Sequence, residues 1–233
     1  ILCYLYYNIN NMSSSSSEKP FIGLIGCGYW GKNLAKDLYN LGALHTICDT
    51  NKNLLEIFKQ KYKNIDVNIS FKNILNNKEI KAIVIALPAE LHYQFAKEAL
   101  LANKDIFIEK PLALNLNEGT ELVELARKKN KILMVGHILH YHPAIEKIFE
   151  LIQENWIGEL RYVTSNRLNL GKFRQNENVL WSFAPHDISL IIQLFQSMPE
   201  NISCHGHSYI SKNIHDVTTT IMNFSGGKHA QIN

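Results

Sequence analysis

From residue 21 onwards, short apolar runs alternate with amphipathic stretches. This alternation is typical of repeated strand–helix units around a parallel sheet. Runs that are apolar enough to be strands covered on both faces lie at residues 21–26, 44–48, 67–70, 82–87, 105–109 and 132–136. Between them, apolar residues recur every three or four positions, as in Leu34, Leu38 and Leu41. The pattern predicts an α/β fold with a doubly wound parallel sheet over residues 20–140.

The pattern changes after residue 140, and a second domain is expected over residues 141–233. Pro143 suits the first turn of a helix whose apolar side chains, at positions 145, 148, 149 and 152, face inward. The further expected elements are a strand over 160–170, a helix over 188–195, strands over 202–210 and 217–224, a hairpin turn at Gly226-Gly227 and a strand from Lys228. Together they predict an α+β domain with an open, mainly antiparallel sheet. The last strand is expected to leave this sheet incomplete, with an unpaired edge.

The first residues differ from the rest of the chain. A serine run at 13–17 has the composition of a flexible linker. A signal peptide needs a positively charged start, and no Lys or Arg precedes Lys19. Residues 1–19 are therefore expected to be a disordered or non-native extension, with Met12 as the native start.

Composition and charge narrow the classes of function. The chain has 233 residues, of which 46% are hydrophobic and 19% charged, and its net charge is +3. This charge is too small for a nucleic-acid-binding surface, and no apolar run approaches the roughly 20 residues of a membrane span. The four cysteines form no C-x-x-C pair, which favours reduced thiols in the cytoplasm. A small-molecule partner is expected, with neither a nucleic acid nor a membrane.

A glycine motif follows the first predicted strand. Gly26 permits a tight turn, Gly28 lets the backbone approach a pyrophosphate, and Gly31 allows close packing of helix on strand. The start of the next helix offers free N–H groups to the phosphates, and the loop residues Tyr29 and Trp30 are expected beside them. The motif predicts a Rossmann domain that binds a dinucleotide.

Asp49 ends the second predicted strand, near the spacing of about 20 residues at which a ribose-binding acid is expected. A carboxylate there accepts hydrogen bonds from the ribose hydroxyls and repels a 2′-phosphate. Neither Thr50 nor Asn51 supplies a compensating cation. The predicted cofactor is therefore NAD and not NADP.

Further motifs follow the later strands. They are Ala86-Leu87-Pro88 with His92, Glu109-Lys110-Pro111, Val135-Gly136-His137, and a helix start at His186-Asp187. With the glycine motif, these features resemble the Gfo/Idh/MocA family of NAD(P)-dependent sugar and cyclitol oxidoreductases, from residue 21 to the end of the sequence. The resemblance adds Leu87, Pro88, His92, Glu109 and Lys110 to the cofactor-binding residues, and it implies that His137 lines the substrate pocket.

In this family, the lysine of the Glu-Lys-Pro motif assists proton transfer at the hydroxyl being oxidised, and a histidine shares the work. The resemblance thus implies that Lys110 and His186 are the catalytic pair. A lysine is mostly protonated at neutral pH unless its surroundings lower its pKa, whereas histidine titrates near neutrality. Which of the two takes the proton first stays open. Many relatives carry Asp four residues before this histidine, where this sequence has Ser182, so a Lys, Asp and His triad is not assumed.

The stretches 165–172 and 181–187 resemble the branch that oxidises C3 of UDP-N-acetylglucosamine or of its uronic acid. Arg167 and Arg174 could pair with a diphosphate, and Trp181 could stack on a ring, with Asn166 nearby. The alternatives are exposed charges for the arginines and core packing for Trp181. A homo-oligomer formed through the second sheet is expected for a full-length protein.

Two other readings stay open. One is an NAD-binding but catalytically silent sensor or interaction protein, and the other is a dehydrogenase of a free sugar or inositol. A metal site is not expected, because His137, His140 and His142 have no carboxylate or cysteine at ligand spacing.

Overall fold

The computed structural model describes residues 21–168 and 177–233, and the chain divides into two compact units between Gly136 and His137. The sequence placed this division between residues 140 and 141. The expected N-terminal extension and the candidate Arg174 lie outside the described residues.

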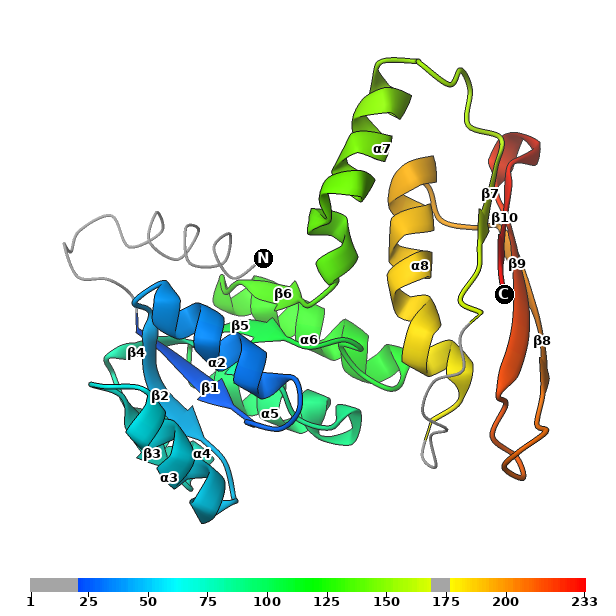
Figure 1. Ribbon diagram of the computed structural model, residues 1–233. Coiled ribbons are helices and arrows are strands. Elements are labelled where there is room, and N and C mark those ends of the chain that lie inside the picture. Colours follow the sequence, from blue (N-terminus) through cyan, green and yellow to red (C-terminus); the bar gives the residue numbers. More distant parts are fainter. Residues whose placement is uncertain (1–20, 169–176) are drawn as a thin grey trace. The chain divides into compact units, whose positions relative to one another are not determined.

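The first unit contains a six-stranded sheet, all of whose strand pairs are parallel (Figure 1). Its order is β3-β2-β1-β4-β5-β6. The strands are β1 (Phe21–Ile25), β2 (Leu44–Cys48), β3 (Asp66–Asn68), β4 (Ile80–Ile85), β5 (Asp105–Ile108) and β6 (Leu133–Val135). This is the strand order of a doubly wound Rossmann fold, in which the order reverses between β1 and β4. The predicted fold class is confirmed.

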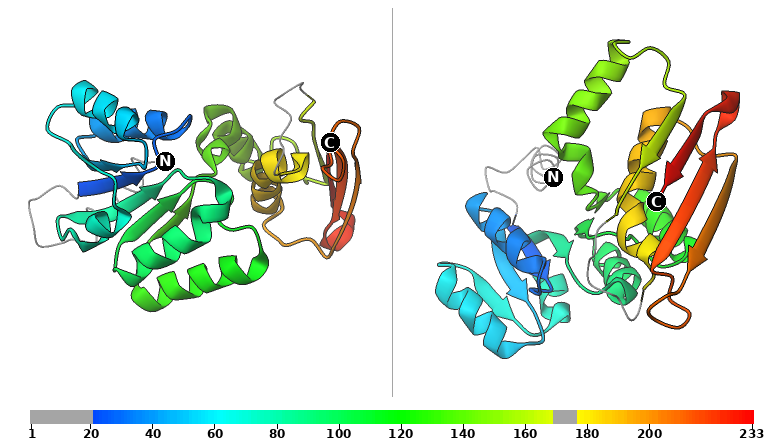
Figure 2. Two further views of the ribbon diagram at one scale, coloured as in Figure 1. Left: turned by 90° about the horizontal axis from the view of Figure 1, so that it is seen from below. Right: turned by 45° about the vertical axis from the view of Figure 1, so that its right-hand side comes forward.

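Helices cover both faces of this sheet (Figures 1 and 2). They are α2 (Gly31–Asn40), α3 (Lys52–Lys61), α4 (Phe71–Asn76), α5 (Ala89–Leu101) and α6 (Leu116–Lys129). Leu34, Leu38 and Phe58 pack in a core on one side, whereas Leu100 and Leu122 belong to the core on the other. Strands between two layers of helices have no solvent-exposed face, so their sequences are continuous apolar runs.

The carboxyl ends of the central strands are held together by main-chain hydrogen bonds. Gly26 donates its N–H to the Cys48 carbonyl at 2.9 Å, Ala86 donates to Ile25 at 2.8 Å, and Glu109 donates to Ile85 at 3.0 Å. The loops that follow β1, β2, β4 and β5 therefore start side by side. In an open α/β sheet, ligands bind at this edge, next to the point where the strand order reverses.

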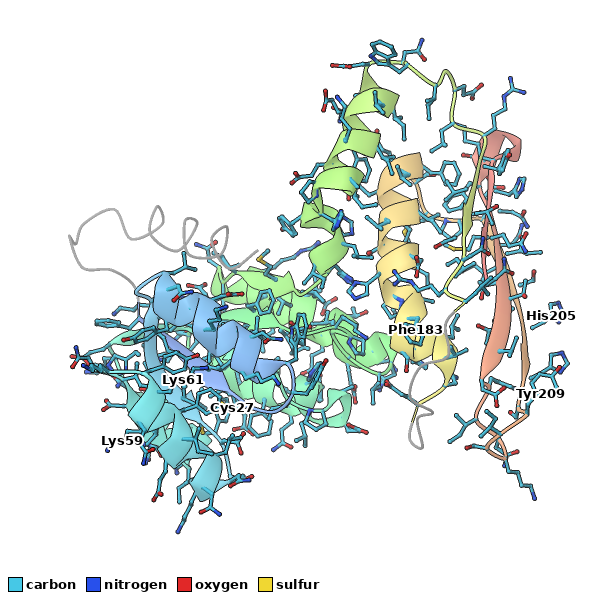
Figure 3. All side chains as sticks on the ribbon, in the orientation of Figure 1. Cys27, Lys59, Lys61, Phe183, His205 and Tyr209 are labelled. Carbon is cyan, nitrogen blue, oxygen red and sulfur yellow. The ribbon has the colours of Figure 1, made fainter. Side chains whose placement is uncertain are left out.

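The second unit holds a four-stranded sheet of order β7-β10-β9-β8. Its strands are β7 (Tyr162–Ser165), β8 (Asn201–His207), β9 (Val217–Asn223) and β10 (His229–Ile232), and its helices are η1 (Ile138–Tyr141), α7 (Pro143–Gln153), α8 (Val179–Phe195) and η2 (Ser225–Gly227). Ile191 on α8 packs with Met222, Phe224 and Ala230 of the sheet side. His205 on β8 and Tyr209 beyond it project away from α8, whose Phe183 is also labelled in Figure 3.

The expected unpaired final strand is wrong. β10 pairs in parallel with β7 and antiparallel with β9, so within the described residues the edges of the sheet are β7 and β8. The hairpin turn at Gly226-Gly227 is confirmed, with φ of 71° and 73°, values that glycine adopts without strain. The wrong expectation has a plain reason: strand order across a sheet depends on pairings distant in sequence.

Expected element boundaries in the second unit also differ. The strand expected over 160–170 is the shorter β7, which ends at Ser165. The helix expected to begin at His186-Asp187 begins at Val179, because the Asn178 side chain accepts a hydrogen bond from the Trp181 N–H at 3.0 Å and caps it there. Pro185 therefore lies inside α8. The strand expected over 202–210 ends at His207, because the Asp216 carboxylate accepts the N–H groups of Tyr209 and Ile210 and turns the chain.

Candidate active site

Two glycines of the motif are required by the packing of the loop itself. A Cβ added to Gly31 would lie 2.1 Å from the Gly26 carbonyl oxygen. One added to Gly26 would lie 2.6 Å from the Ala86 carbonyl oxygen, and Gly26 also has a φ of 88°. Contacts this short cannot form, so both positions must lack a side chain for the loop to close on the sheet.

Gly28 is different, because a Cβ added there would meet no atom within 4 Å. Its φ is not in the left-handed region either. Nothing within the described protein accounts for a glycine at this exposed position. A bound group that comes close to the backbone does account for it, so the loop fits a dinucleotide whose pyrophosphate lies against Gly28.

The start of α2 supports the same fit. Its N-cap residue, Trp30, makes no side-chain capping hydrogen bond, and the first turn contains no acidic residue. In contrast, the Asn51 side chain caps α3 by accepting the Leu54 N–H at 3.1 Å. The N-terminus of a helix favours an anion. At α2, no side chain of the cap or the first turn supplies one, so this end can accept a phosphate. Tyr29 in this loop is 81% exposed, with the Lys32 ammonium 5.0 Å from its ring centroid.

Asp49 connects the glycine loop with the loop after β2. Its Oδ2 accepts the Cys27 N–H at 2.8 Å, and its Oδ1 accepts the Asn51 N–H at 2.9 Å. Each oxygen accepts one hydrogen bond here and retains a lone pair for another donor. The carboxylate is thus held in a fixed orientation at the sheet edge and can still accept hydrogen bonds from ribose hydroxyls.

Trp30 and Glu109 join the loops after β1 and β5. The Trp30 indole N–H donates to Glu109 Oε1 at 2.6 Å. Burial raises the pKa of the Glu109 carboxyl above its ordinary value, and the hydrogen bond from Trp30 opposes this rise. A Cβ on Gly136 would lie 3.1 Å from both Glu109 carboxylate oxygens, so Gly136 makes room for this side chain.

Lys110 follows Glu109 and is half-buried, between β5 and Pro111. Leu87 and Pro88 follow β4, and a Cβ on Gly26 would lie 3.0 Å from the Leu87 side chain. The motif residues of β1, β4 and β5 therefore gather at one edge of the first unit.

His92 differs from the expected cofactor contact. The ring is only 1% exposed, and both of its nitrogens contact main-chain oxygens. Nδ1 lies 2.6 Å from the Pro111 carbonyl and Nε2 lies 2.9 Å from the Leu87 carbonyl. A buried ring with both nitrogens engaged does not reach a ligand. His92 instead ties the loop after β4 to the loop that carries Lys110.

In the second unit, three histidines lie near one another. The ring of His137 lies edge-on to His186 at 5.9 Å between centroids and to His140 at 6.0 Å. His140 Nε2 lies 2.9 Å from the Ser189 hydroxyl, which donates to the His186 carbonyl at 2.8 Å, and His140 Nδ1 contacts the Gln193 side chain. The structure thus brings together two sequence candidates, His137 and His186, and adds His140, which the sequence analysis left without a role.

Arg167 is engaged within the protein, whereas the sequence left open a pairing with a diphosphate or an exposed charge. Its Nε donates to Asp187 Oδ2 at 2.7 Å and its Nη2 to Asp187 Oδ1 at 3.3 Å, while the Ser165 hydroxyl donates to Asp187 Oδ1 at 2.7 Å. The Asp187 side chain is 6% exposed and that of Arg167 is 29% exposed. Removing one partner of such a buried pair typically costs about 3–5 kcal/mol. The sequence analysis missed this pairing, because no local pattern joins residues 20 positions apart.

The other candidates of the second unit are more exposed. Trp181 is 38% exposed on α8, so it is not fully packed in the core. Asn166 is exposed and accepts a hydrogen bond from the Asn233 side chain at 2.9 Å. Ser182 is buried, and its hydroxyl donates to the Glu177 carboxylate at 2.9 Å.

Two searches of the described residues bear on other classes of site. No group of three or more His, Cys, Asp or Glu side chains among them could hold a metal ion. None of the described helices has the length and apolar character needed to cross a membrane. The described cysteines, Cys27, Cys48 and Cys204, are free thiols.

Two family models match the chain. One, for an oxidoreductase family with an NAD-binding Rossmann fold, covers residues 21–137, and the second, for the Gfo/Idh/MocA C-terminal domain, covers residues 145–233. The chain is 26% identical over 225 residues to an uncharacterized oxidoreductase of Streptococcus pneumoniae, covering 89% of this chain and 60% of that protein. It is 25% identical over 216 residues to the UDP-N-acetylglucosamine 3-dehydrogenase of Acidithiobacillus ferrooxidans, covering 90% and 65%. The chain thus spans less than two thirds of the length of these relatives.

Solved structures agree. The crystal structure of the Acidithiobacillus ferrooxidans 3-dehydrogenase superposes with a TM-score of 0.80 at 25% identity, covering 91% of this chain and 67% of that one. An NAD-binding protein of Listeria innocua superposes with a TM-score of 0.79 at 21% identity, covering 92% and 66%, and shows the shared fold. With both family models matched along the two units, the chain belongs to the Gfo/Idh/MocA family of NAD-binding oxidoreductases.

Proposed function

We propose that this protein oxidises a hydroxyl-bearing carbon of a sugar, with NAD as the hydride acceptor. The observation that carries the proposal is the edge of the first sheet. There, Gly28 leaves open space, α2 has an uncapped start, and Asp49 is fixed between two loops. These features together fit NAD, and Glu109-Lys110 follow the adjacent strand.

Oxidation of an alcohol has two requirements. The C–H hydrogen leaves with both bonding electrons for NAD, and the O–H proton goes to a base, which leaves a ketone, NADH and a proton on the base. Lys110 and His186 are the proposed proton-transfer residues, and which one takes the proton first is for experiment to decide. Glu109 and Asp49 are proposed to orient the cofactor through its hydroxyl groups.

We propose a nucleotide sugar as the substrate, with C3 of a UDP-N-acetylated hexose as the position oxidised. The support is similarity to a protein named UDP-N-acetylglucosamine 3-dehydrogenase, in sequence and in fold. Trp181 and His137 are proposed to contact the sugar, and Asn166 to lie beside it. Because Arg167 is paired with Asp187, we do not assign it to the diphosphate.

The test is incubation with NAD and a panel of compounds: UDP-N-acetylglucosamine, its uronic acid, N-acetylglucosamine and myo-inositol. We expect NADH absorbance with a UDP-sugar, and a product lighter by two hydrogen atoms. In the matched variant Lys110→Met, turnover should fall by about a hundredfold or more while NAD affinity is kept, as for loss of a proton-transfer group. Turnover of myo-inositol or the free sugar alone would replace the proposed substrate, and NAD binding without any turnover would favour a silent sensor.

A further inference from the structure

We infer that Arg167, Ser165 and Asp187 form a clamp that positions His186, and that Arg167 acts on the reaction through this histidine and not by binding the substrate. The inference rests on the proposed function, since it assigns His186 to proton transfer. It differs from both roles that the sequence left open for Arg167, a diphosphate ligand and an exposed charge. The three residues are called the α8 clamp below.

The clamp is built around one buried carboxylate that accepts hydrogen bonds on both of its oxygens. Asp187 accepts three hydrogen bonds: two from the Arg167 guanidinium, at 2.7 and 3.3 Å, and one from the Ser165 hydroxyl, at 2.7 Å. Two N–H groups of one planar guanidinium on both oxygens of one carboxylate fix orientation as well as distance. The Nε–H and one Nη–H of Arg167 thus donate to Asp187, so these two donors do not contact a ligand.

The clamp acts on the part of α8 that needs support. Pro185 lies inside this helix, and a proline has no N–H to donate to the carbonyl four residues earlier. The helix is therefore least restrained by its own hydrogen bonds just before His186. Asp187 is the next residue, and it is bound to β7 through Ser165 and to the following segment through Arg167.

The other side of His186 is held from η1. The Ser189 hydroxyl donates to the His186 carbonyl at 2.8 Å, and His140 Nε2 lies 2.9 Å from the same hydroxyl. His137 packs edge-on to the His186 ring at 5.9 Å between centroids. The described contacts place His137 against the His186 ring, and His140 one hydroxyl away from the His186 carbonyl. Asp187 follows His186 on α8 and pairs with Arg167 from the segment after β7. The Arg167–Asp187 pair joins this turn of α8 to the segment that follows β7.

The first test needs no substrate. The ring signal of His186 is followed by NMR in the full chain, assigned with the variant His186→Asn, across a pH titration. We expect Arg167→Gln and Asp187→Asn to move the His186 signal and its titration midpoint. The matched control is Arg161→Gln, which removes an arginine that is 81% exposed and 3.9 Å from Glu159. An unmoved His186 signal in both clamp variants would overturn the inference, whatever the substrate is.

The second test separates positioning from binding. With NAD and UDP-N-acetylglucosamine, Arg167→Gln should lower kcat by about tenfold or more and change KM by less than about threefold, as expected when transition-state and not ground-state interactions are lost. UDP alone should bind Arg167→Gln as tightly as the unaltered chain. Arg167→Lys, which keeps the charge but not the planar fork, should recover only part of kcat.

The opposite result is equally clear. A raised KM with unchanged kcat, together with weakened UDP binding, would make Arg167 a diphosphate ligand and overturn the inference. If Arg167→Gln fails to fold, Ser165→Ala removes one donor of the clamp and leaves the ion pair, and it should lower kcat by a smaller factor with KM unchanged. If the chain oxidises no UDP-sugar, the proposed substrate fails, and the NMR titration still decides the clamp.

Discussion

At the scale of single residues, Gly28 and Gly31 make the sharpest contrast. The Gly31→Ala side chain would lie 2.1 Å from a carbonyl oxygen, whereas Gly28→Ala would meet no atom within 4 Å. We expect Gly28→Ala to unfold at the same temperature as the unaltered chain and to bind NAD about tenfold or more weakly, because its methyl group enters the space of the pyrophosphate. Gly31→Ala should lower the free energy of unfolding by about 1–3 kcal/mol or more, as for overpacking. Calorimetry measures both properties, and unchanged NAD affinity in Gly28→Ala would move the pyrophosphate elsewhere.

Glu109 predicts a pH dependence of stability. Burial raises the pKa of this carboxyl, so the folded chain binds the proton more tightly than the unfolded chain. The resulting stabilisation is complete below the ordinary carboxyl pKa and is lost as the pH rises through the raised value. Glu109→Gln cannot ionise, so its free energy of unfolding should exceed that of the unaltered chain at neutral pH. The difference should shrink as the pH falls through this interval.

Urea unfolding at a series of pH values measures this difference. Asp66→Asn, a change of an exposed carboxylate in the same unit, is the control. If the free energies of unfolding of Glu109→Gln and the unaltered chain differ by the same amount at every pH, ionisation of Glu109 does not destabilise the folded chain. The Trp30 hydrogen bond acts in the other direction, because it favours the carboxylate, and so limits the gain.

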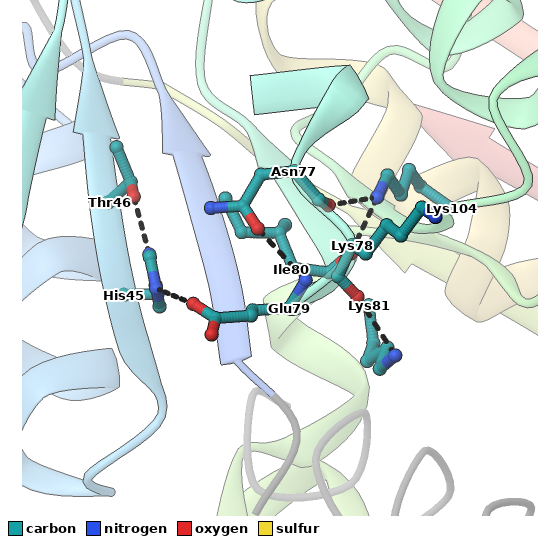
Figure 4. Close-up of polar contacts among 8 residues, drawn as sticks. All are labelled: His45, Thr46, Asn77, Lys78, Glu79, Ile80, Lys81 and Lys104. Atoms are coloured by element: carbon teal, nitrogen blue, oxygen red, sulfur yellow. Dashed lines mark hydrogen bonds and ion pairs between the residues drawn. The ribbon is translucent and has the colours of Figure 1, made fainter. Parts of the chain in front are cut away.

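At the scale of elements, Lys104 ties two turns at the amino-terminal edge of the first sheet (Figure 4). Its ammonium donates to the carbonyls of Asn77 and Ile80, each at 2.7 Å, and the side chain is buried. Lys104→Met should lower the free energy of unfolding by about 1–3 kcal/mol, because buried carbonyls lose their donors. In the unaltered chain, the exposed Lys81 ammonium donates to the Lys78 carbonyl at 2.9 Å. Lys81→Met should therefore lower the free energy of unfolding by only about 0.5 kcal/mol or less.

Urea unfolding compares the two lysine variants, and NAD titration provides the second measurement. Lys104 precedes β5, whereas the glycine motif follows β1. In a parallel sheet, the two therefore lie at opposite ends of the strands. NAD affinity should therefore be unchanged in Lys104→Met. Equal stability of the two variants would mean that solvent satisfies the Asn77 and Ile80 carbonyls.

The elements also show how far sequence reasoning reaches. The strands of the first unit were predictable because burial on both faces makes each an uninterrupted apolar run. Their ends were less so: β3 stops at Asn68, whose side chain accepts the Ser70 N–H at 2.8 Å and forms a turn. In the second unit, the helix start was expected at His186-Asp187, and Asn178 was not recognised as the residue that caps α8. The central place of β10 follows from pairings that no local pattern encodes.

The sequence likewise predicted some residues of the candidate site but not the contacts between them. The glycines and Asp49 were predictable because each meets a requirement of one loop or one strand end. The contacts that hold the site were not, since Trp30 and Glu109 are 79 positions apart and Arg167 and Asp187 are 20 apart. Spacing in the sequence carries no information on which polar side chains meet at such distances. The family resemblance assigned His92 to the cofactor, whereas both of its ring nitrogens contact main-chain carbonyls.

At the scale of the whole molecule, the two units have separate cores. The first unit has helices on both sides of its sheet, and the second has its own core between α8 and the strands. All of the features that fit NAD, namely the glycine loop, Asp49 and Glu109, belong to the first unit. The first unit should therefore fold and bind NAD by itself.

The prediction is that a fragment of residues 20–136 binds NAD within about threefold of the affinity of the full chain, since no residue of the second unit is needed for the dinucleotide. At a concentration of NAD 100 times its dissociation constant, the free energy of unfolding of this fragment should rise by about 2.7 kcal/mol. The fragment of residues 137–233 should show no such rise. Titration calorimetry and thermal unfolding of both fragments, with Gly28→Ala as the control in the first, make the measurement. A fragment 20–136 that folds cooperatively but loses NAD affinity tenfold or more would show that the second unit supplies part of the dinucleotide site, and would shift the search for its contacts to His137 and His186.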